Sequence, residues 1–137
     1  MALRAIRVSE SVLAELLGYA RQQPGQECCG LLAGRGRTIT RIFPAANVAA
    51  DPAKNYEIGP KELFAVMRQM RAEDVCLMGI FHSHPNGTNE PSPGDIERAY
   101  YPDAAYFVIS PHSDSAVPVR AFSMRDGQVE ELEIRTE

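Results

Sequence analysis

The residues most able to support chemistry lie in one short stretch, GIFHSHPNGTNEPSPGD, at residues 79–95. It places two of the chain's three histidines, His82 and His84, one residue apart at the end of an apolar run. A serine, Ser92, and an aspartate, Asp95, follow on a segment rich in proline and glycine. Such a stretch is either a strand end that happens to adjoin a helix start, or a metal site.

The spacing of the two histidines suits a pair of metal ligands. In a β-strand, side chains at positions i and i+2 point to one face, so His82 and His84 project together while Ser83 points away. Neutral imidazole nitrogens bind a divalent metal without bringing a charge that must be buried. Pro85 ends the strand directly after the pair and leaves it open to solvent. Taken alone, however, an HxH pattern is more often two strand-end histidines than a ligand pair.

The segment Ser92-Pro93-Gly94-Asp95 is, by itself, typical of a helix start. Serine is a favoured N-cap, proline a favoured first residue, and an acid in the first turn closes a capping box. The intervening loop is long enough to bring this helix start back to the strand end. Asp95 would then face the histidines. Two histidines and one carboxylate leave the fourth position of a tetrahedral metal site for water, as in catalytic zinc sites. Ser92 would cap the helix or donate to a developing oxyanion.

The same residues resemble the signature of a known family. His82-Ser83-His84, seven residues, Ser92, two residues and Asp95 match the HxHx(7)SxxD motif of the JAMM (MPN+) zinc metalloproteases. Upstream, ECCGLLAG at residues 27–34 is similar to the family's ExCGLL-type strand, whose glutamate is not a metal ligand. The resemblance runs from that strand to AYFVIS at 105–110. It implies one zinc ion held by His82, His84 and Asp95, with Glu27 as general base and Ser92 as oxyanion donor.

The choice of Glu27 depends on that resemblance. On the residues alone, three other glutamates are equally eligible as the acid: Glu57, Glu62 and Glu90. Each of the four also has the simpler interpretation of a solvated surface carboxylate. Only the match to the family's strand selects Glu27.

The elements that would position these residues alternate between strands and helices. Apolar or alternating runs predict strands at 5–9, 28–34, 38–43, 75–82, 105–110, 117–124 and 129–135, with a short strand at 55–58. Helical spacing of apolar residues predicts helices between Ser9 and Pro24, from Pro60, and over 93–100. With the resemblance, this order predicts an α/β fold: one layered MPN-type domain over residues 1–137, cytidine-deaminase-like, with a mixed curved β-sheet flanked by helices.

The composition excludes several functional classes. A chain of 137 residues with 45% hydrophobic and 23% charged residues is ordinary for a globular domain, and its net charge of -4 provides no basic surface. No apolar run approaches the roughly 20 residues of a membrane span, and the first residues do not form a signal peptide. Without CxxC spacing, Cys29 and Cys76 are interpreted as small buried hydrophobes. We therefore expect a cytoplasmic protein with no nucleic-acid or membrane partner.

The resemblance implies a zinc-dependent peptidase with a specific kind of substrate. The family acts mainly on amides at the C-terminal tails of ubiquitin-like proteins, and this chain looks like its minimal stand-alone prokaryotic branch. We expect hydrolysis after the C-terminal Gly-Gly of a small ubiquitin-like sulfur-carrier protein, releasing an amino acid such as cysteine or a short extension. The tail would add as a strand to an open edge beside the zinc. A homodimer is compatible with this interpretation.

Three alternatives are kept for comparison. A non-catalytic MPN scaffold would use the same fold only to bind partners, but such scaffolds typically lack the ligands that are intact here. A zinc nucleobase deaminase would need an HxE and PCxxC ligand pattern, which this sequence does not contain. A zinc peptidase of broader specificity would differ only in its substrate, which the sequence does not name.

Overall fold

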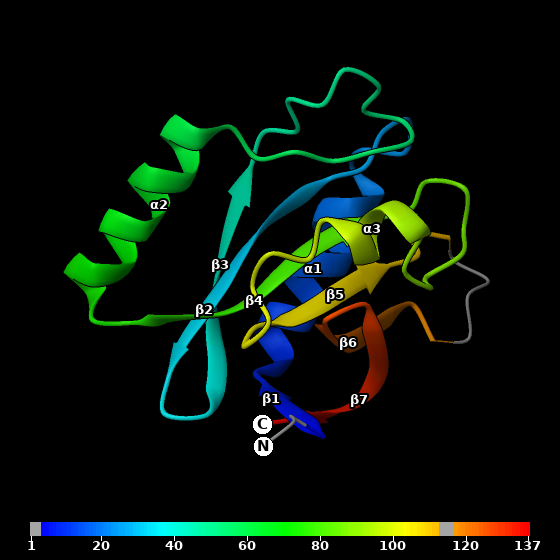
Figure 1. The fold of residues 1–137 in the computed structure, drawn as a ribbon. Coiled ribbons are helices and arrows are strands. Elements are labelled where there is room, and N and C mark those ends of the chain that lie inside the picture. Colours follow the sequence, from blue (N-terminus) through cyan, green and yellow to red (C-terminus); the bar gives the residue numbers. More distant parts are fainter. Residues whose placement is uncertain (1–3, 113–116) are drawn as a thin grey trace.

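The fold is built around one strongly curved β-sheet, described by a computed structural model for residues 4–112 and 117–137 (Figure 1). The strands are β1 (Ala5–Val8), β2 (Cys29–Arg35), β3 (Thr38–Ala45), β4 (Cys76–Ser83), β5 (Ala105–Ile109), β6 (Val119–Arg125) and β7 (Gln128–Thr136). The helices are α1 (Glu10–Arg21), α2 (Pro60–Glu73) and α3 (Pro93–Glu97). This order of elements follows the prediction closely.

The sheet is mixed, and it closes on itself in the order β1-β3-β2-β4-β5-β6-β7. Parallel pairing joins β4 to β5, and β1 to both β3 and β7, while the other neighbours are antiparallel. Because β1 pairs with β7, the two ends of the chain lie side by side (Figure 1). The expected open strand edge beside the histidines is wrong for the described residues, because β4 has β2 on one side and β5 on the other.

The central strands of the sheet are buried on both faces. Helix α1 shares one core cluster with residues from every strand and lies within the curve of the sheet, where Leu32, Phe81 and Phe107 point. The alternate residues Leu31, Ile80 and Tyr106 point to the outer face, where α2 packs. Figure 1 shows α1 and α2 on these opposite sides. Burial on both faces explains why β4 is apolar throughout and not alternating.

Local capping signals define the ends of the helices. The Ser9 side chain accepts a hydrogen bond from the Val12 amide at the start of α1, as predicted. Helix α2 begins at Pro60, also as predicted. Helix α3 is shorter than the predicted 93–100 and ends at Glu97. None of the described helices is long and apolar enough to cross a membrane.

Two smaller expectations are wrong. The predicted strand at 55–58 is only a single bridge between Asn47 and Ile58, because the segment folds as a loop around the Asn47 side chain. Cys29 is buried as expected, but Cys76 is exposed because it is the first residue of β4, outside the covered part of the sheet.

Candidate metal and catalytic site

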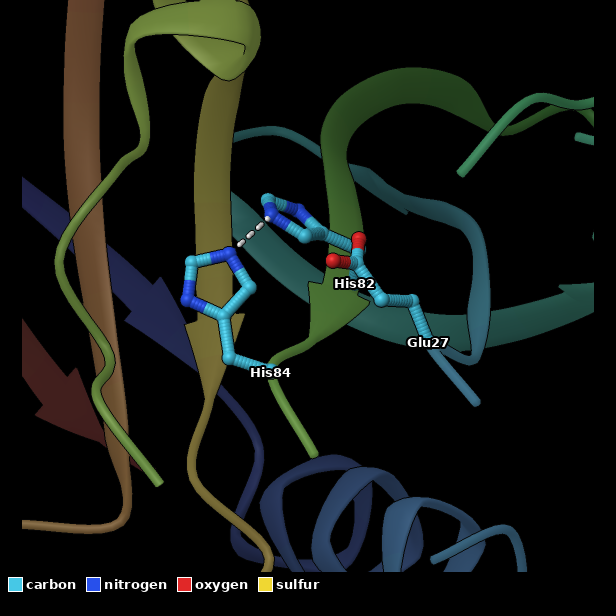
Figure 2. Close-up of side chains that lie close together, drawn as sticks. All are labelled: Glu27, His82 and His84. Atoms are coloured by element: carbon cyan, nitrogen blue, oxygen red, sulfur yellow. Dashed lines mark hydrogen bonds between the residues drawn. The ribbon is translucent and has the colours of Figure 1, made fainter. Parts of the chain in front are cut away.

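The two histidines of the motif meet at the end of β4. His82 is fully buried and lies on the outer face of the sheet, as Ile80 does two residues earlier. His84 follows the last residue of the strand. Figure 2 shows the two rings approaching through their Nε2 atoms, which are 3.0 Å apart. The alternation of the strand therefore places both imidazoles on one face, as predicted.

Helix α3 brings Asp95 to the histidines. Its Oδ2 atom lies 3.0 Å from Nε2 of His82 and 3.1 Å from Nε2 of His84. The same oxygen accepts a hydrogen bond of 2.8 Å from the Ser92 amide, while the Asp95 amide donates to Oγ of Ser92 at 3.1 Å. This capping box fixes the carboxylate in the direction of the imidazoles. The helix-cap interpretation is therefore confirmed, and the same capping box brings Asp95 to the histidines, as the metal-site interpretation requires.

The loop before α3 is tied to the strands next to it. The Ser110 hydroxyl donates to the Gly87 carbonyl at 2.8 Å, and the His112 ring contacts the Pro85 carbonyl at 2.8 Å through Nε2. Asn89 donates to the Val117 carbonyl. These contacts hold residues 85–92 against the end of β5 and the start of β6, which returns the chain to the histidines. The third histidine thus supports the loop and is not part of the cluster.

The three converging atoms pass a geometric test for a metal site. Zinc binds histidine nitrogens and carboxylate oxygens at about 2.0–2.2 Å in a tetrahedron, whose edges are then about 3.4 Å long. The ligand atoms of His82, His84 and Asp95 lie 3.0–3.1 Å apart, close to one face of such a tetrahedron. These residues therefore fit one divalent ion.

The surroundings of the two imidazoles also suit metal binding. Nδ1 of His84 lies 2.8 Å from the Thr88 carbonyl, which can only accept, so Nδ1 keeps its proton and Nε2 is the nitrogen that can offer a lone pair to a metal. The ring of His82 is stacked on Tyr56, with centroids 4.3 Å apart and planes 18° from parallel. Nδ1 of His82 is buried and has no hydrogen-bond partner among the described residues. Stacking, and not a second hydrogen bond, sets the orientation of this ring.

Burial and charge set the protonation states of the cluster in the absence of a metal. Burial lowers the pKa of His82, which therefore stays neutral. Burial also opposes a charge on His84, but the hydrogen bond and charge of Asp95 outweigh it and raise the pKa of His84. Burial alone would raise the pKa of Asp95, yet the hydrogen bonds from both histidines hold it well below its usual range. The aspartate is thus ionised, and a cation is favoured between it and the imidazoles.

Glu27 reaches the cluster through the pairing of β2 with β4. Because these strands are antiparallel, the start of β2 lies beside the end of β4, with Cys29 opposite His82. Ser83 strengthens this register: its hydroxyl accepts from the Cys28 amide at 2.9 Å, and its amide donates to the Cys28 carbonyl at 3.0 Å. A carboxylate oxygen of Glu27 and one ring nitrogen from each histidine lie within 4.8 Å of one another (Figure 2).

The environment of Glu27 differs from that of a surface acid. Its side chain is 5% exposed, and its Oε1 atom has no hydrogen-bond partner among the described residues. Burial raises the pKa of Glu27 to about 7, against the opposing positive charges of His84 and Arg98. A carboxylate with a pKa near 7 can both accept and return a proton at neutral pH. The simpler interpretation as a solvated carboxylate does not fit this residue.

The other glutamates are placed for different contacts. Glu57 is exposed, and its backbone amide donates to the side chain of Asn47. Glu62 accepts from the Ala46 amide, and Glu90 is an exposed acid 3.7 Å from Arg120. Of the four glutamates, only Glu27 forms a cluster of possible metal ligands with the two histidines.

Asn47 connects Glu27 to the loop at 46–58, in addition to the hydrogen bond that the Glu27 amide donates to the Pro52 carbonyl at 2.7 Å. Nδ2 of Asn47 donates to the carbonyls of Glu27 and Asn55, each at 2.9 Å, and its Oδ1 accepts from the amides of Ala49 and Glu57 at 3.0 and 3.1 Å. This loop also carries Tyr56, which stacks on the buried imidazole. Sequence reasoning missed both residues, since nothing in this irregular segment distinguishes them.

Two spaces flank the cluster. A groove of about 340 Å³ runs past Glu27, His84 and Ser92, with Lys54 and Glu90 among its lining residues. A cavity of about 220 Å³ lies on the other side of Asp95, lined by Tyr56 and several further aromatic and aliphatic residues. Because Oγ of Ser92 uses a lone pair to cap α3, its proton remains free to donate into the groove.

Known proteins share this sequence pattern. Residues 9–125 match the model of the family described as prokaryotic homologues of the JAB domain. A desampylase of Haloferax volcanii is 36% identical over 104 residues, which cover 74% of this chain and 75% of the relative. A CysO-cysteine peptidase of Mycobacterium tuberculosis is 30% identical over 118 residues, which cover 85% of this chain and 80% of the relative.

Solved structures share the fold. A solution structure of a Desulfitobacterium hafniense protein has a TM-score of 0.86 and 31% identity, covering 96% of this chain and 92% of that protein. A structure described as JAMM, a metalloprotease-like zinc site in the proteasome and signalosome, has a TM-score of 0.62 at 17% identity, covering 96% and 98%. These likenesses confirm the predicted MPN-type α/β fold with its mixed, curved sheet.

The two buried carboxylates should differ in their effect on zinc binding. Asp95→Asn removes a charge from an atom 3.0–3.1 Å from both imidazole nitrogens, so we expect zinc affinity to fall by roughly 100-fold or more. The zinc affinity of Glu27→Gln should stay within a few-fold of the wild-type value. Competition with a chromogenic chelator at pH 7 measures both. An equal loss in the Glu27 variant would make Glu27 a ligand.

Glu27 should also make the stability of the metal-free protein depend on pH. Its folded pKa of about 7 exceeds the ordinary value of 4.5, so the folded state keeps the proton longer than the unfolded state. Stability contributed by this group is therefore lost as pH rises from about 4.5 to 7. Metal-free Glu27→Gln should gain on the order of 3 kcal/mol over metal-free wild type between pH 5 and pH 8. Urea denaturation at both pH values tests this; a constant difference would contradict it.

Asn47 should matter more for stability than its neighbour in the same loop. Asn47→Ala removes the donor and acceptor that join Glu27 to residues 49–57, so we expect a loss of about 2–3 kcal/mol in the free energy of unfolding. Asn55→Ala is the matched control: among the described residues, the Asn55 side chain makes only an exposed hydrogen bond with Arg98, so this change should cost less than about 1 kcal/mol. Equal losses in urea denaturation would contradict the central role of Asn47.

Proposed function

This chain belongs to the family of prokaryotic JAB-domain homologues, and on that basis we propose that it is a zinc-dependent peptidase. Its substrate in this proposal is a small ubiquitin-like sulfur-carrier protein, cleaved after the C-terminal Gly-Gly. Residues 1–137 form one such domain in the proposal, which is supported by the pairing of the first and last strands.

The observation that carries the proposal is the arrangement of two carboxylates around one pair of histidines. Asp95 is ionised and bonded to both imidazoles, whereas Glu27 is buried nearby with an unpartnered oxygen. A scaffold that only binds partners has no need of a second buried acid with a pKa near 7. The pair supports one ligand role and one acid–base role, as peptide hydrolysis requires.

We assign His82, His84 and Asp95 as the residues that hold the zinc ion. When bound, zinc supplies Lewis-acid polarisation of a carbonyl and a water of lowered pKa. Glu27 accepts a proton from the attacking water as the new C–O bond forms at the glycine carbonyl carbon. It then returns that proton to the nitrogen of the leaving amine as the C–N bond breaks. One water is consumed, and no other reactant is needed.

Ser92 donates to the oxygen that develops negative charge in this reaction. Its hydroxyl oxygen accepts the Asp95 amide and its proton is free, so capping α3 and stabilising an oxyanion do not compete. The capping box at the same time holds the carboxylate of Asp95 on the histidines. A single turn of helix therefore positions both a ligand and an oxyanion donor.

The substrate class rests on the chemistry of the groove and on the relatives. The two relatives described above are a desampylase and a CysO-cysteine peptidase. Glycine has no side chain, so a Gly-Gly tail can pass close to Glu27 and His84 along the groove. The tail lies between the loop at 85–92 and Lys54, since both edges of β4 are paired. A cytoplasmic setting completes the proposal and suits three unpaired cysteines.

The proposal predicts a defined change of mass in the substrate. Zinc-loaded enzyme should shorten an intact sulfur carrier that bears an added residue after Gly-Gly, and the new C-terminus should be the second glycine. Glu27→Gln should bind zinc but lose turnover by several orders of magnitude, because Asp95, the other buried acid at the cluster, is bonded to both histidines and cannot replace Glu27 as the base. Mass spectrometry of the intact carrier, incubated with each protein, gives the measurement.

Several controls sharpen this experiment. An isolated tail peptide should be a much poorer substrate than the intact carrier, because contacts with the folded carrier position the amide. Ready cleavage of general peptides with no shortened carrier would indicate a broad peptidase. Zinc binding without any cleavage would favour a scaffold.

A further inference from the structure

The cavity beside Asp95 has the features of a binding site that the reaction steps above do not use. Its volume is about 220 Å³, and its walls are mostly aromatic and aliphatic: Tyr56, Ile58, Leu63, Ile80, Tyr101 and Tyr106. An apolar cavity of about 150 Å³ is enough to hold a benzene molecule. The cavity is therefore large enough for one amino-acid side chain.

Arg98 is the only cation among the residues that line this cavity. Its Nε donates to the Gly94 carbonyl at 3.2 Å, and its Nη2 donates to Oδ1 of Asn55 at 3.1 Å. Both acceptors are neutral, and in residues 4–112 and 117–137 no carboxylate oxygen lies within 4.0 Å of the guanidinium. Because a guanidinium has five N–H donors, three remain for a ligand.

The position of Arg98 links the cavity to the reaction site. It is the C-cap residue of α3, the helix that carries Asp95 in its first turn. Its charge is close enough to oppose the raised pKa of Glu27. Two acids also line the cavity, and they leave the Arg98 guanidinium available to a ligand. Asp95 is bonded to the two histidines, and Glu57 is exposed.

The two spaces beside the cluster differ in what they can hold. The groove past Glu27 and His84 is lined by loop residues with polar side chains and can take a glycine tail whose folded body stays outside. The cavity beside Asp95 is smaller, apolar-walled and has one cation. An extended substrate that crosses the cluster places one side of its scissile bond in each space. The cavity, which is the smaller space, suits the smaller of the two parts of the substrate.

We propose that the cavity binds the single residue released by hydrolysis, and that Arg98 pairs with the α-carboxylate of that residue. This inference rests on the proposed function and narrows its substrate class. A carrier extended by one residue presents a free carboxylate two bonds from the leaving nitrogen. A lysine side chain joined to the carrier presents only methylene groups there. The enzyme is therefore specific for a single C-terminal residue over a lysine-linked conjugate.

The test compares two substrates that differ only in the charge at this position. One is a carrier ending in Gly-Gly-Ala with a free carboxylate, and the other is the same carrier with a C-terminal carboxamide. Wild type should favour the free acid by about 10- to 100-fold in kcat/KM, as expected for a charge-assisted pair. Arg98→Gln should bring the ratio of kcat/KM for the acid to that for the amide close to one.

A binding measurement provides a readout that does not depend on turnover. In the Glu27→Gln background, which leaves the substrates uncut, the acid should bind more tightly than the amide by a similar factor in calorimetry. Adding Arg98→Gln should abolish that difference, and Arg98→Lys should restore part of it because the charge is kept. Because Arg98 is exposed, these variants should fold, and their melting temperatures verify this.

Two matched controls separate the charge from its surroundings. Asn55→Ala removes the bond between Arg98 and the loop but keeps the cation, so the preference for the acid should remain. Lys54→Gln removes a cation that lines the groove and not the cavity, so it too should leave the preference intact. Loss of the preference in Lys54→Gln would overturn the assignment to Arg98.

The outcomes distinguish failure of this inference from failure of the proposed function. Equal cleavage of acid and amide by wild type overturns the inference alone, as does an equal loss of both activities in Arg98→Gln. No cleavage of either substrate by zinc-loaded wild type overturns the proposed function and this inference with it. Faster cleavage of a lysine-linked carrier than of the free acid also overturns the inference.

Discussion

Three atoms with lone pairs converge to within 3.0–3.1 Å at the end of β4, and the rest of the site depends on that convergence. Two imidazole nitrogens and a carboxylate oxygen are stable so close together only when a proton or a metal cation lies between them. The fold maintains the arrangement with rigid elements: a strand buried on both faces holds the histidines, and a capped helix turn holds Asp95. Sites built on helices and strands are held more precisely than sites built on loops.

The residues that stabilise the fold locally are also those assigned to the chemistry. Ser92 and Asp95 close a capping box, and the same carboxylate oxygen that accepts the Ser92 amide faces both imidazoles. Ser83, between the two histidines, uses its hydroxyl to fix the register of β2 against β4 and so positions Glu27. Residues of this kind serve stability and function together, because one hydrogen bond orients two groups.

The loop at 46–58 completes the site from outside the sheet. Asn47 joins it to the backbone of Glu27, Tyr56 stacks on the buried imidazole, and Asn55 holds Arg98. The loop therefore contacts the proposed base, a proposed ligand and the proposed carboxylate-binding residue. One segment with almost no regular secondary structure thus contacts all three parts of the proposed site.

The sequence by itself determined the local parts of this site. Strand alternation predicts that His82 and His84 share one face, and the helix-start pattern at Ser92 predicts the first turn in which Asp95 lies. Both predictions depend only on neighbouring residues. The tertiary structure decided the rest. Glu27 lies 55 residues before His82 and reaches it only through the antiparallel register of β2 and β4, which local patterns do not reveal, so the sequence needed a family resemblance to select it. Closure of the sheet, the stacking of Tyr56 and the cavity at Arg98 likewise depend on contacts between distant segments, and no periodicity in one segment encodes them.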